Sequence, residues 1–279
     1  MHKQAAGFEI KAHAGTIREV LGLSAPLIIA NMSQSMMWVV DTFVMGRVGN
    51  AEQGAVVLAG VLVWASVSFF IGTMSVINIL VAQDYGAGRQ DLARHVRAGL
   101  LLALPMSALV IALWPLVPHA LTLMHVADAT RPFAQTYLQI RLPSAPLILG
   151  TSVFASYLRG VGDTVTPMVV VLVANAINAV VSVVLVFGWL GFPALGVAGA
   201  AIGTVAACAA ELGMYAAVFW FGERSRANGS RVITIPSRAQ ARQLLSLGAP
   251  IGLAWLFEMV AWTSFSIYAG SRPPEELAA

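Results

Sequence analysis

Long apolar stretches, separated by short polar connections, dominate this chain. Seven segments are long enough to cross a membrane, where a helix needs about 20 predominantly apolar residues. They cover residues 23–46, 55–81, 97–118, 133–157, 165–188, 194–221 and 245–270. Internal prolines such as Pro143 and Pro146 do not argue against spans, because membrane helices tolerate them, and the fourth and fifth segments are candidates for kinks. The pattern predicts a multi-pass, all-α integral membrane protein.

Composition supports the same class. Only 10% of the residues are charged and 58% are hydrophobic, with a mean hydropathy of +0.78, whereas soluble domains carry roughly a quarter charged residues. The formal charge of +3 is typical of basic cytoplasmic loops, so we expect the lipid bilayer and no nucleic acid as a partner. The single cysteine, Cys208, excludes a disulfide framework.

The distribution of basic residues predicts the orientation of the chain. With a cytoplasmic N-terminus, twelve of the sixteen Lys and Arg residues fall in or beside inside segments. Only Arg47, Arg131 and Arg141 fall in the segments on the outer side of the membrane or at their margins, and Arg272 lies in the tail. Because positive charge marks cytoplasmic loops, we expect a cytoplasmic N-terminus, with the protein in the cell (inner) membrane.

An internal repeat links the first and seventh segments. A shift of 224 residues aligns Leu21, Leu23, Ala25, Pro26, Ala30, Trp38 and Gly46 with Leu245, Leu247, Ala249, Pro250, Ala254, Trp262 and Gly270. Six intervening spans give both copies the same direction, as in parallel transporter repeats. Chance identities between two apolar helices are the alternative explanation.

The repeat predicts how the chain is divided. We expect a cytoplasmic N-terminal segment at 1–20 and a six-helix transmembrane lobe at 21–222. A cytoplasmic inter-lobe loop follows at 223–244, then the first helix of a second lobe at 245–270 and a short tail at 271–279. A second lobe or a homo-oligomer would have to complete such an assembly.

Three acidic residues lie within the predicted spans, where a charge costs roughly 3 kcal/mol at the helix centre. Asp41, near the outer end of the first span, and Glu258, near the middle of the seventh, are candidate coupling or substrate sites. The alternatives are an interfacial acid for Asp41 and, for Glu258, a buried acid paired for structure with an amide or Arg141. Glu211 has only Ala, Cys and Leu around it in sequence, and we leave it out of the predicted site.

Polar residues on other spans extend the candidate site. Asn178 and Ser182 are four residues apart and share a helix face, with Asn175 one turn earlier. Gln34 is the position that Glu258 matches in the repeat. Amides facing a bundle interior either bind a cation or a carboxylate, or simply bond neighbouring helices.

The sequence motifs of several enzyme classes are missing. There is no His-Glu-x-x-His, Gly-x-Ser-x-Gly or Gly-x-x-x-x-Gly-Lys pattern. Both lysines, Lys3 and Lys11, precede the first span, which excludes a retinal Schiff base within the bundle. We therefore expect no enzyme and no cofactor, with energy taken from an ion gradient or another chain.

Four ordered motifs carry a family resemblance. They are VDTFVMGRVG at 40–49, AQDYGAG at 82–88, LRGVGDT at 158–164 and GFPALGVAGAA at 191–201. Together they resemble the multidrug and toxic compound extrusion (MATE) family, over roughly residues 16 to 270. The loop motifs at 86–88 and 160–164 are expected to serve helix connection and rocking rather than ligand contact.

The resemblance implies a twelve-helix antiporter of two six-helix lobes, which exports drugs or organic cations in exchange for protons or sodium ions. Asp41 matches the family's acid in helix one, Asn178 its helix-five Asn and Glu258 a helix-seven acid. Tyr137 is similar to a helix-four pocket residue, and Asp41 with Asn178 is the candidate sodium site. Ser182 stands where many relatives carry Asn or Asp, which removes a possible sodium ligand.

Two other readings remain. A lipid-linked precursor flippase of the same superfamily would show a more cationic central cavity, so arginines lining it would favour that function. A non-transporting seven-helix receptor or binding subunit suits an outside N-terminus, which the charge distribution opposes.

Overall fold

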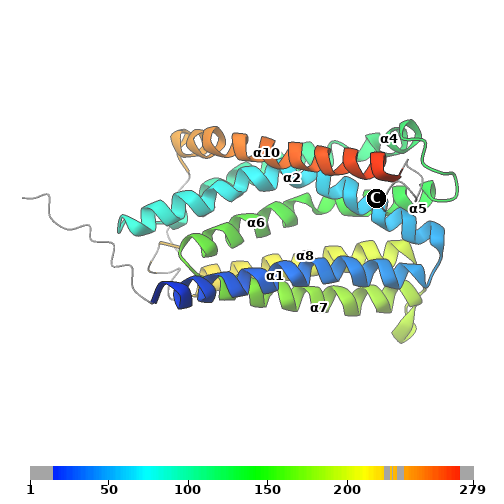
Figure 1. The fold of residues 1–279 in the computed structure, drawn as a ribbon, viewed down its shortest axis with the longest axis horizontal. Coiled ribbons are helices and arrows are strands. Elements are labelled where there is room, and N and C mark those ends of the chain that lie inside the picture. The colour runs from blue at the N-terminus through cyan, green and yellow to red at the C-terminus, as the bar shows by residue number, and fades with distance from the viewer. Residues whose placement is uncertain (1–14, 223–226, 228, 231–235, 271–279) are drawn as a thin grey trace, which may run out of the picture.

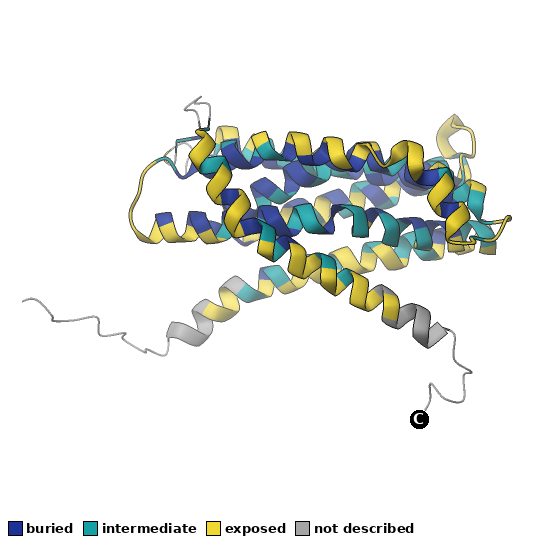
Figure 2. Cartoon of the chain, turned by 90° about the horizontal axis from the view of Figure 1, so that it is seen from above, coloured by how far each residue is buried: buried dark blue, intermediate teal, exposed yellow. Residues whose placement is uncertain are grey.

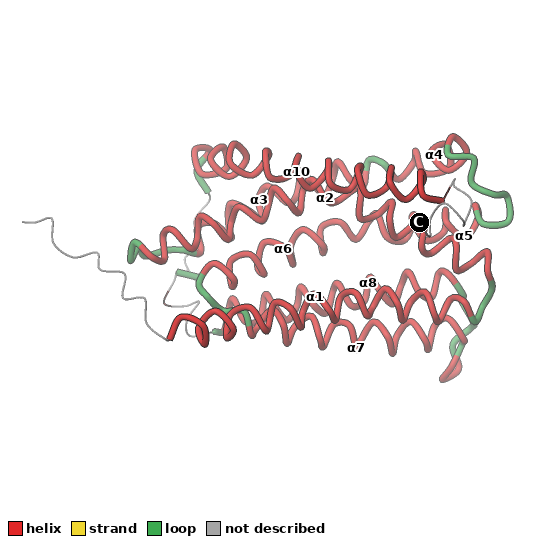
Figure 3. Tube along the Cα trace, viewed as in Figure 1, coloured by secondary structure: helices red, strands yellow, loops and turns green. Residues whose placement is uncertain are grey.

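The computed structural model describes residues 15–222, 227, 229–230 and 236–270, and among these every regular element is a helix (Figure 3). The long helices are α1 (Gly15–Gly46), α2 (Asn50–Gly86), α3 (Ala93–Ile111), α7 (Val165–Phe187), α8 (Val197–Phe221) and α10 (Arg238–Gly270). The shorter ones are α4 (Val117–Leu123), α5 (Arg131–Arg141) and α6 (Ala145–Gly160), with 3-10 turns at Trp114–Leu116, Leu142–Ser144 and Trp189–Gly191. In the described part of the chain, six helices are long and apolar enough to cross a membrane. The predicted all-α membrane fold is confirmed.

The fourth predicted span is a broken helix. A 3-10 turn at Leu142–Ser144 separates α5 from α6. Pro143 has no N–H, so it cannot donate to the carbonyl of Gln139, four residues earlier. The indole of Trp114 donates to that oxygen instead, at 3.0 Å. A side chain from the 3-10 turn between α3 and α4 thus satisfies the backbone group that the proline leaves free.

The two repeat copies form the longest unbroken helices after α2. α1 has 32 residues and α10 has 33, each with its proline, Pro26 or Pro250, inside the helix. α1 begins within the segment expected to precede the first span, and α10 begins seven residues before position 245. Figures 1 and 2 show both helices on one face of the bundle, at opposite sides of it. α1 packs on α7 and α2, whereas α10 packs on α2 and α3.

Glycines allow the closest helix contacts. On α8, a Cβ on Gly199 would lie 2.7 Å from the backbone of Leu185, and one on Gly203 would collide with Ser182. On α2, a Cβ on Gly72 would lie 2.9 Å from the Cα of Gly252 on α10. Small residues let membrane helices approach at backbone distance, so they fix the α7–α8 and α2–α10 pairs that flank the bundle.

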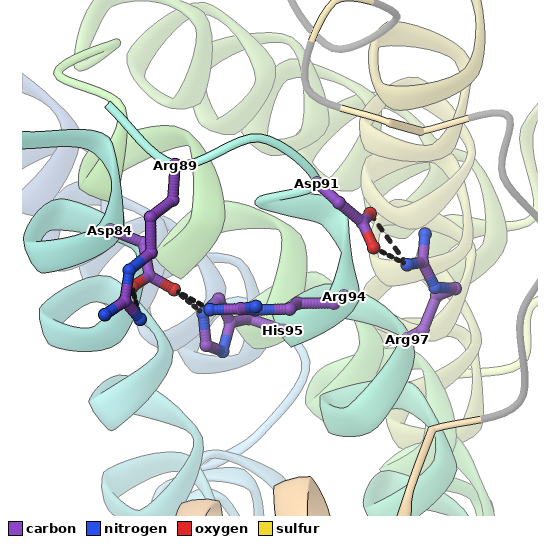
Figure 4. Close-up of polar contacts among 6 residues, drawn as sticks. All are labelled: Asp84, Arg89, Asp91, Arg94, His95 and Arg97. Atoms are coloured by element: carbon purple, nitrogen blue, oxygen red, sulfur yellow. Dashed lines mark hydrogen bonds and ion pairs between the residues drawn. The ribbon is translucent and has the colours of Figure 1, made fainter. Parts of the chain in front are cut away.

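The polar connections gather at one end of the bundle, where α2 meets α3, α6 meets α7 and α10 begins (Figure 1). Figure 4 shows the α2–α3 connection, in which the buried Asp84 carboxylate receives three partners. Arg89 Nη1 lies 3.1 Å from Oδ1, while Arg94 Nη2 and His95 Nε2 lie 2.5 and 2.6 Å from Oδ2. The carboxylate thus joins the last turn of α2 to the first turn of α3.

Two further contacts organise this end. Arg97 Nη2 lies 2.7 Å from both oxygens of Asp91, and Arg97 Nη1 donates to the carbonyl of Gly229 at 3.2 Å, in the segment that leads to α10. Asp163 accepts from the backbone N–H and the hydroxyl of Thr166, at 2.9 and 2.7 Å, in the first turn of α7. The motifs at 82–88 and 158–164 therefore lie in connections that are fixed by side-chain contacts.

Candidate functional site

A cavity of about 750 Å³ runs along the interior of the bundle. Its wall is built from α1, α2, α5, α6, α7 and α8, with Trp255 contributed by α10. The volume is in the range of about 300–1,000 Å³ that is usual for small-molecule sites. Of the residues predicted from the sequence, Gln34, Asp41, Tyr137 and Asn175 line it.

Asp41 and Asn178 meet where α1, α7 and α8 come together. In the amide orientation that satisfies both neighbours, Asn178 Nδ2 donates to Asp41 Oδ1 at 3.2 Å. The Asn178 carbonyl oxygen then lies 3.3 Å from the backbone nitrogen and 3.2 Å from Oγ1 of Thr204. Asn178 is fully buried and Asp41 is half-buried. The two residues that the sequence paired as a coupling site are thus hydrogen-bonded to each other.

Tyr137 and Arg141 face this pair from α5. Tyr137 is buried, and its polar neighbours are Arg141, Asp41 and Thr204. Arg141 ends α5 next to the Pro143 break, and its Nη1 donates to Ser144 Oγ at 3.2 Å and lies 3.8 Å from Cys208 Sγ. Its buried Nε has no hydrogen-bond partner. The charge pattern assigned Arg141 to the outside or its margin and the sequence also offered it as a partner of Glu258; the structure places Arg141 in the cavity wall, which Glu258 does not line.

Three other predicted residues have separate surroundings. Asn175 Nδ2 donates to Ser33 Oγ at 2.6 Å and joins α7 to α1. Gln34 faces the cavity from an exposed position on α1. Ser182 is buried against Gly203, its hydroxyl lacks a hydrogen-bond partner, and it is not among the residues lining the cavity.

Glu258 lies apart from this group. It is exposed on α10 and does not line the cavity. The structure therefore brings Asp41, Asn178 and Tyr137 together and leaves Glu258 on the outer surface of the described part of the chain.

The cavity contains groups that lie outside the predicted site. Glu211, Tyr215 and Cys208 line it from α8, and Arg159 lines it from the last turn of α6. Three tryptophans, Trp38, Trp64 and Trp255, complete an aromatic wall. One signal was available in the sequence: Thr204, Cys208, Glu211 and Tyr215 follow one another at spacings of four, three and four, which is one face of a helix.

Comparisons with known proteins agree with this architecture. A family model described as MatE matches residues 26–184. The multidrug resistance protein MdtK of Klebsiella pneumoniae is 30% identical over 260 residues, which are 90% of this chain and 55% of that protein. The chain spans about half the length of the curated relatives it matches.

Solved structures share the fold. A MOP superfamily transporter from Pyrococcus furiosus, described with a binding pocket of reverse polarity, aligns with a TM-score of 0.73 at 24% identity, over 90% of this chain and 55% of that one. A multidrug resistance MATE family transporter in an outward-facing conformation aligns with a TM-score of 0.72 at 23% identity, with the same coverage of both chains.

Proposed function

This chain belongs to the MatE family, and from that premise we propose that it forms the substrate-binding lobe of a secondary antiporter that exports drugs or organic cations. The chain would lie in the cell (inner) membrane with its N-terminus in the cytoplasm, as the distribution of basic residues indicates. Export would require a second lobe, supplied by further chain or by another copy, because alternating access needs two bodies that rock around a central site.

The hydrogen bond between Asn178 and Asp41 is the observation that carries the proposal. It holds a carboxylate in the wall of a membrane-embedded cavity, without a salt bridge in the part of the chain that the structure describes. A carboxylate in such a place is neutralised when it binds a proton or a cation, and this neutralisation biases the packing of the helices around it. Asp41 would be the coupling acid and Asn178 the residue that positions it.

A proton suits this pair better than a sodium ion. In the amide orientation that satisfies both neighbours, the nitrogen of Asn178 rather than its oxygen faces Asp41, so the amide would offer a donor where sodium would need an oxygen ligand. Ser182, one helical turn further along α7, packs against Gly203 and does not line the cavity. Ser182 therefore adds no oxygen ligand beside the carboxylate.

The remaining cavity wall suits organic cations. Trp38, Trp64 and Tyr137 present aromatic rings, which attract cations through their faces. Drug-sized ligands need this combination of apolar area and a few fixed polar groups.

Efflux of a fluorescent cationic dye from drug-sensitive cells tests the proposal. Wild-type chain should lower dye retention relative to vector, and Asp41→Asn should abolish the difference. The matched control is Asp128→Asn, since the Asp128 side chain is 94% exposed. Pumping by Asp41→Asn at the wild-type rate would refute the coupling role, and wild type that inserts correctly but matches vector would show that this chain does not export by itself.

The coupling ion can be separated in proteoliposomes. A proton gradient in sodium-free buffer should drive dye movement by wild-type chain, whereas a sodium gradient at equal pH should not. The reverse result would assign the coupling role to sodium.

A second candidate is export of an anionic, lipid-linked substrate, which Arg141 and Arg159 in the cavity wall favour. Asp41 and Glu211 lie in the same wall, so the formal charges balance and the cavity is not the strongly cationic one that this function predicts. Transport of an anionic dye that is lost in Arg159→Gln, with no transport of the cationic dye, would select it.

A further inference from the structure

Glu211 is a carboxylate of the cavity that the coupling site does not use. It follows Thr204 by seven residues on α8, which is about 10 Å of helix rise, so it lies well along the cavity from the Asp41–Asn178 bond. The direction is toward the end of the bundle where Arg159 closes α6. Glu211 therefore marks a second position for a ligand.

The surroundings of Glu211 leave its charge without a fixed partner. Cys208 and Tyr215 are its titratable neighbours on α8, one turn to either side. Arg159 lines the same cavity from α6, near the titratable hydroxyl of Tyr215. Among the described residues, neither Glu211 nor Arg159 forms a salt bridge. A carboxylate in an apolar setting costs free energy unless something pairs with it.

A second polar group in this part of the cavity is also unused. Ser156 lies one turn before Arg159 on α6, lines the cavity and is completely buried. Its hydroxyl has no hydrogen-bond partner. Most buried polar groups are satisfied, so an orphaned hydroxyl on a cavity wall indicates a position that a ligand or its water would fill.

We propose that Glu211, with Tyr215 beside it and Ser156 on the neighbouring helix, forms a second binding station for lipophilic organic cations. The carboxylate would pair with the charge, the Tyr215 ring would meet an apolar substituent, and the Ser156 hydroxyl would bond the ligand or a bridging water. The station rests on the proposed transport function, and it is separate from the Asp41 site because Asp41 acts on the coupling ion.

The unique cysteine provides a direct readout of occupancy. Cys208 is partly accessible, lines the same cavity and lies one turn from Glu211. A ligand at the station should slow the reaction of Cys208 with a maleimide on the purified 279-residue chain. Protection is measured as the ratio of rates with and without ligand in each variant, because removal of a neighbouring charge changes the thiolate fraction itself.

The probes are tetraphenylphosphonium and tetraphenylborate, which have nearly the same shape and opposite charge. Tetraphenylphosphonium should protect Cys208 in the wild-type chain, and Glu211→Gln should raise its half-protection concentration at least tenfold. Glu211→Asp should stay within threefold of wild type. The control Glu52→Gln, the same change in the first turn of α2 and outside the cavity wall, should have no effect.

Several results would overturn the station. The first is a half-protection concentration of tetraphenylphosphonium that is the same in Glu211→Gln as in wild type. The second is an equal loss of protection for both ions in Glu211→Gln, which would indicate a packing role. The third is stronger protection of wild type by tetraphenylborate, which would assign the cavity to anions. If Glu211→Gln does not yield folded protein, the comparison of the two ions on wild type and on Glu211→Asp still decides the matter. Dye efflux that depends on Asp41 but not on Glu211 would refute the station alone, whereas wild type that neither binds nor exports the cation would refute the transport proposal as well.

Discussion

The acids at the end of the bundle and the acids in the cavity are held in opposite ways. Asp84 is surrounded by Arg89, Arg94 and His95, all within 3.1 Å. Asp41 has one amide hydrogen bond, and Glu211 has no salt bridge among the described residues. A carboxylate whose partners belong to the protein serves the fold, whereas one without such partners is available to an ion or a ligand.

The largest test of this contrast is Asp84→Asn. Removing one member of a buried ion pair costs about 3–5 kcal/mol, because the partner charges stay behind without compensation. We expect the purified chain to lose about 3 kcal/mol of stability, seen as a lower melting temperature in a fixed detergent. An unchanged melting temperature would mean that the contacts of Asp84 are not structural.

Glu211→Gln should act in the opposite direction. The amide keeps the shape of the side chain and removes a charge from the cavity wall, where burial of an unpaired charge is unfavourable. We expect stability to rise by about 1 kcal/mol in the same melting assay. A loss of similar size would show that Glu211 is held by the protein, as Asp84 is, and would remove the contrast.

Arg89→Gln sharpens the contrast within the Asp84 cluster. The Arg89 side chain is 63% exposed, in comparison with 30% for Arg94, and an exposed ion pair contributes only about 0.5 kcal/mol. The melting temperature should fall slightly. The difference in melting temperature between wild type and Arg89→Gln should be smaller still at high salt, because salt screens an exposed ion pair. A loss as large as that of Asp84→Asn would contradict this division of the cluster.

Glu258→Gln should have the smallest effect on stability. Glu258 is exposed on α10 and forms no salt bridge among the described residues, so Glu258→Gln removes no ion pair within that part of the chain. The melting curve should coincide with that of wild type within error. A clear shift in either direction would show that Glu258 has a partner in the purified state.

The sequence predicted those features that depend on one helix at a time. Apolar length gave six of the seven predicted spans as long helices, and the matched prolines both lie inside their helices, α1 and α10, which have nearly equal lengths. The spacing of Asn178 and Ser182 gave a shared helix face, but it could not show that Gly203 covers Ser182 while Asn178 reaches Asp41.

The features that were missed depend on several helices together. Glu211 has apolar neighbours in sequence, and although it shares a helix face with Thr204, Cys208 and Tyr215, only the fold brings Arg159 and Ser156 of α6 to the same cavity. Arg141 was placed at the membrane margin because the break after α5 cannot be read from charge counting. The backbone hydrogen bond that Pro143 cannot make is replaced by one from the Trp114 indole, in the 3-10 turn after α3. No local sequence pattern predicts such a replacement.

That replacement has a consequence for how this sequence can change over generations. The break in the fourth span is specified twice, by Pro143 and, 29 positions earlier, by the indole of Trp114 that serves the carbonyl of Gln139. A chain with an ordinary amide at position 143 would satisfy the carbonyl by itself and would no longer need the indole. The two positions should therefore covary, and a substitution tolerated at one of them should depend on what the other has become.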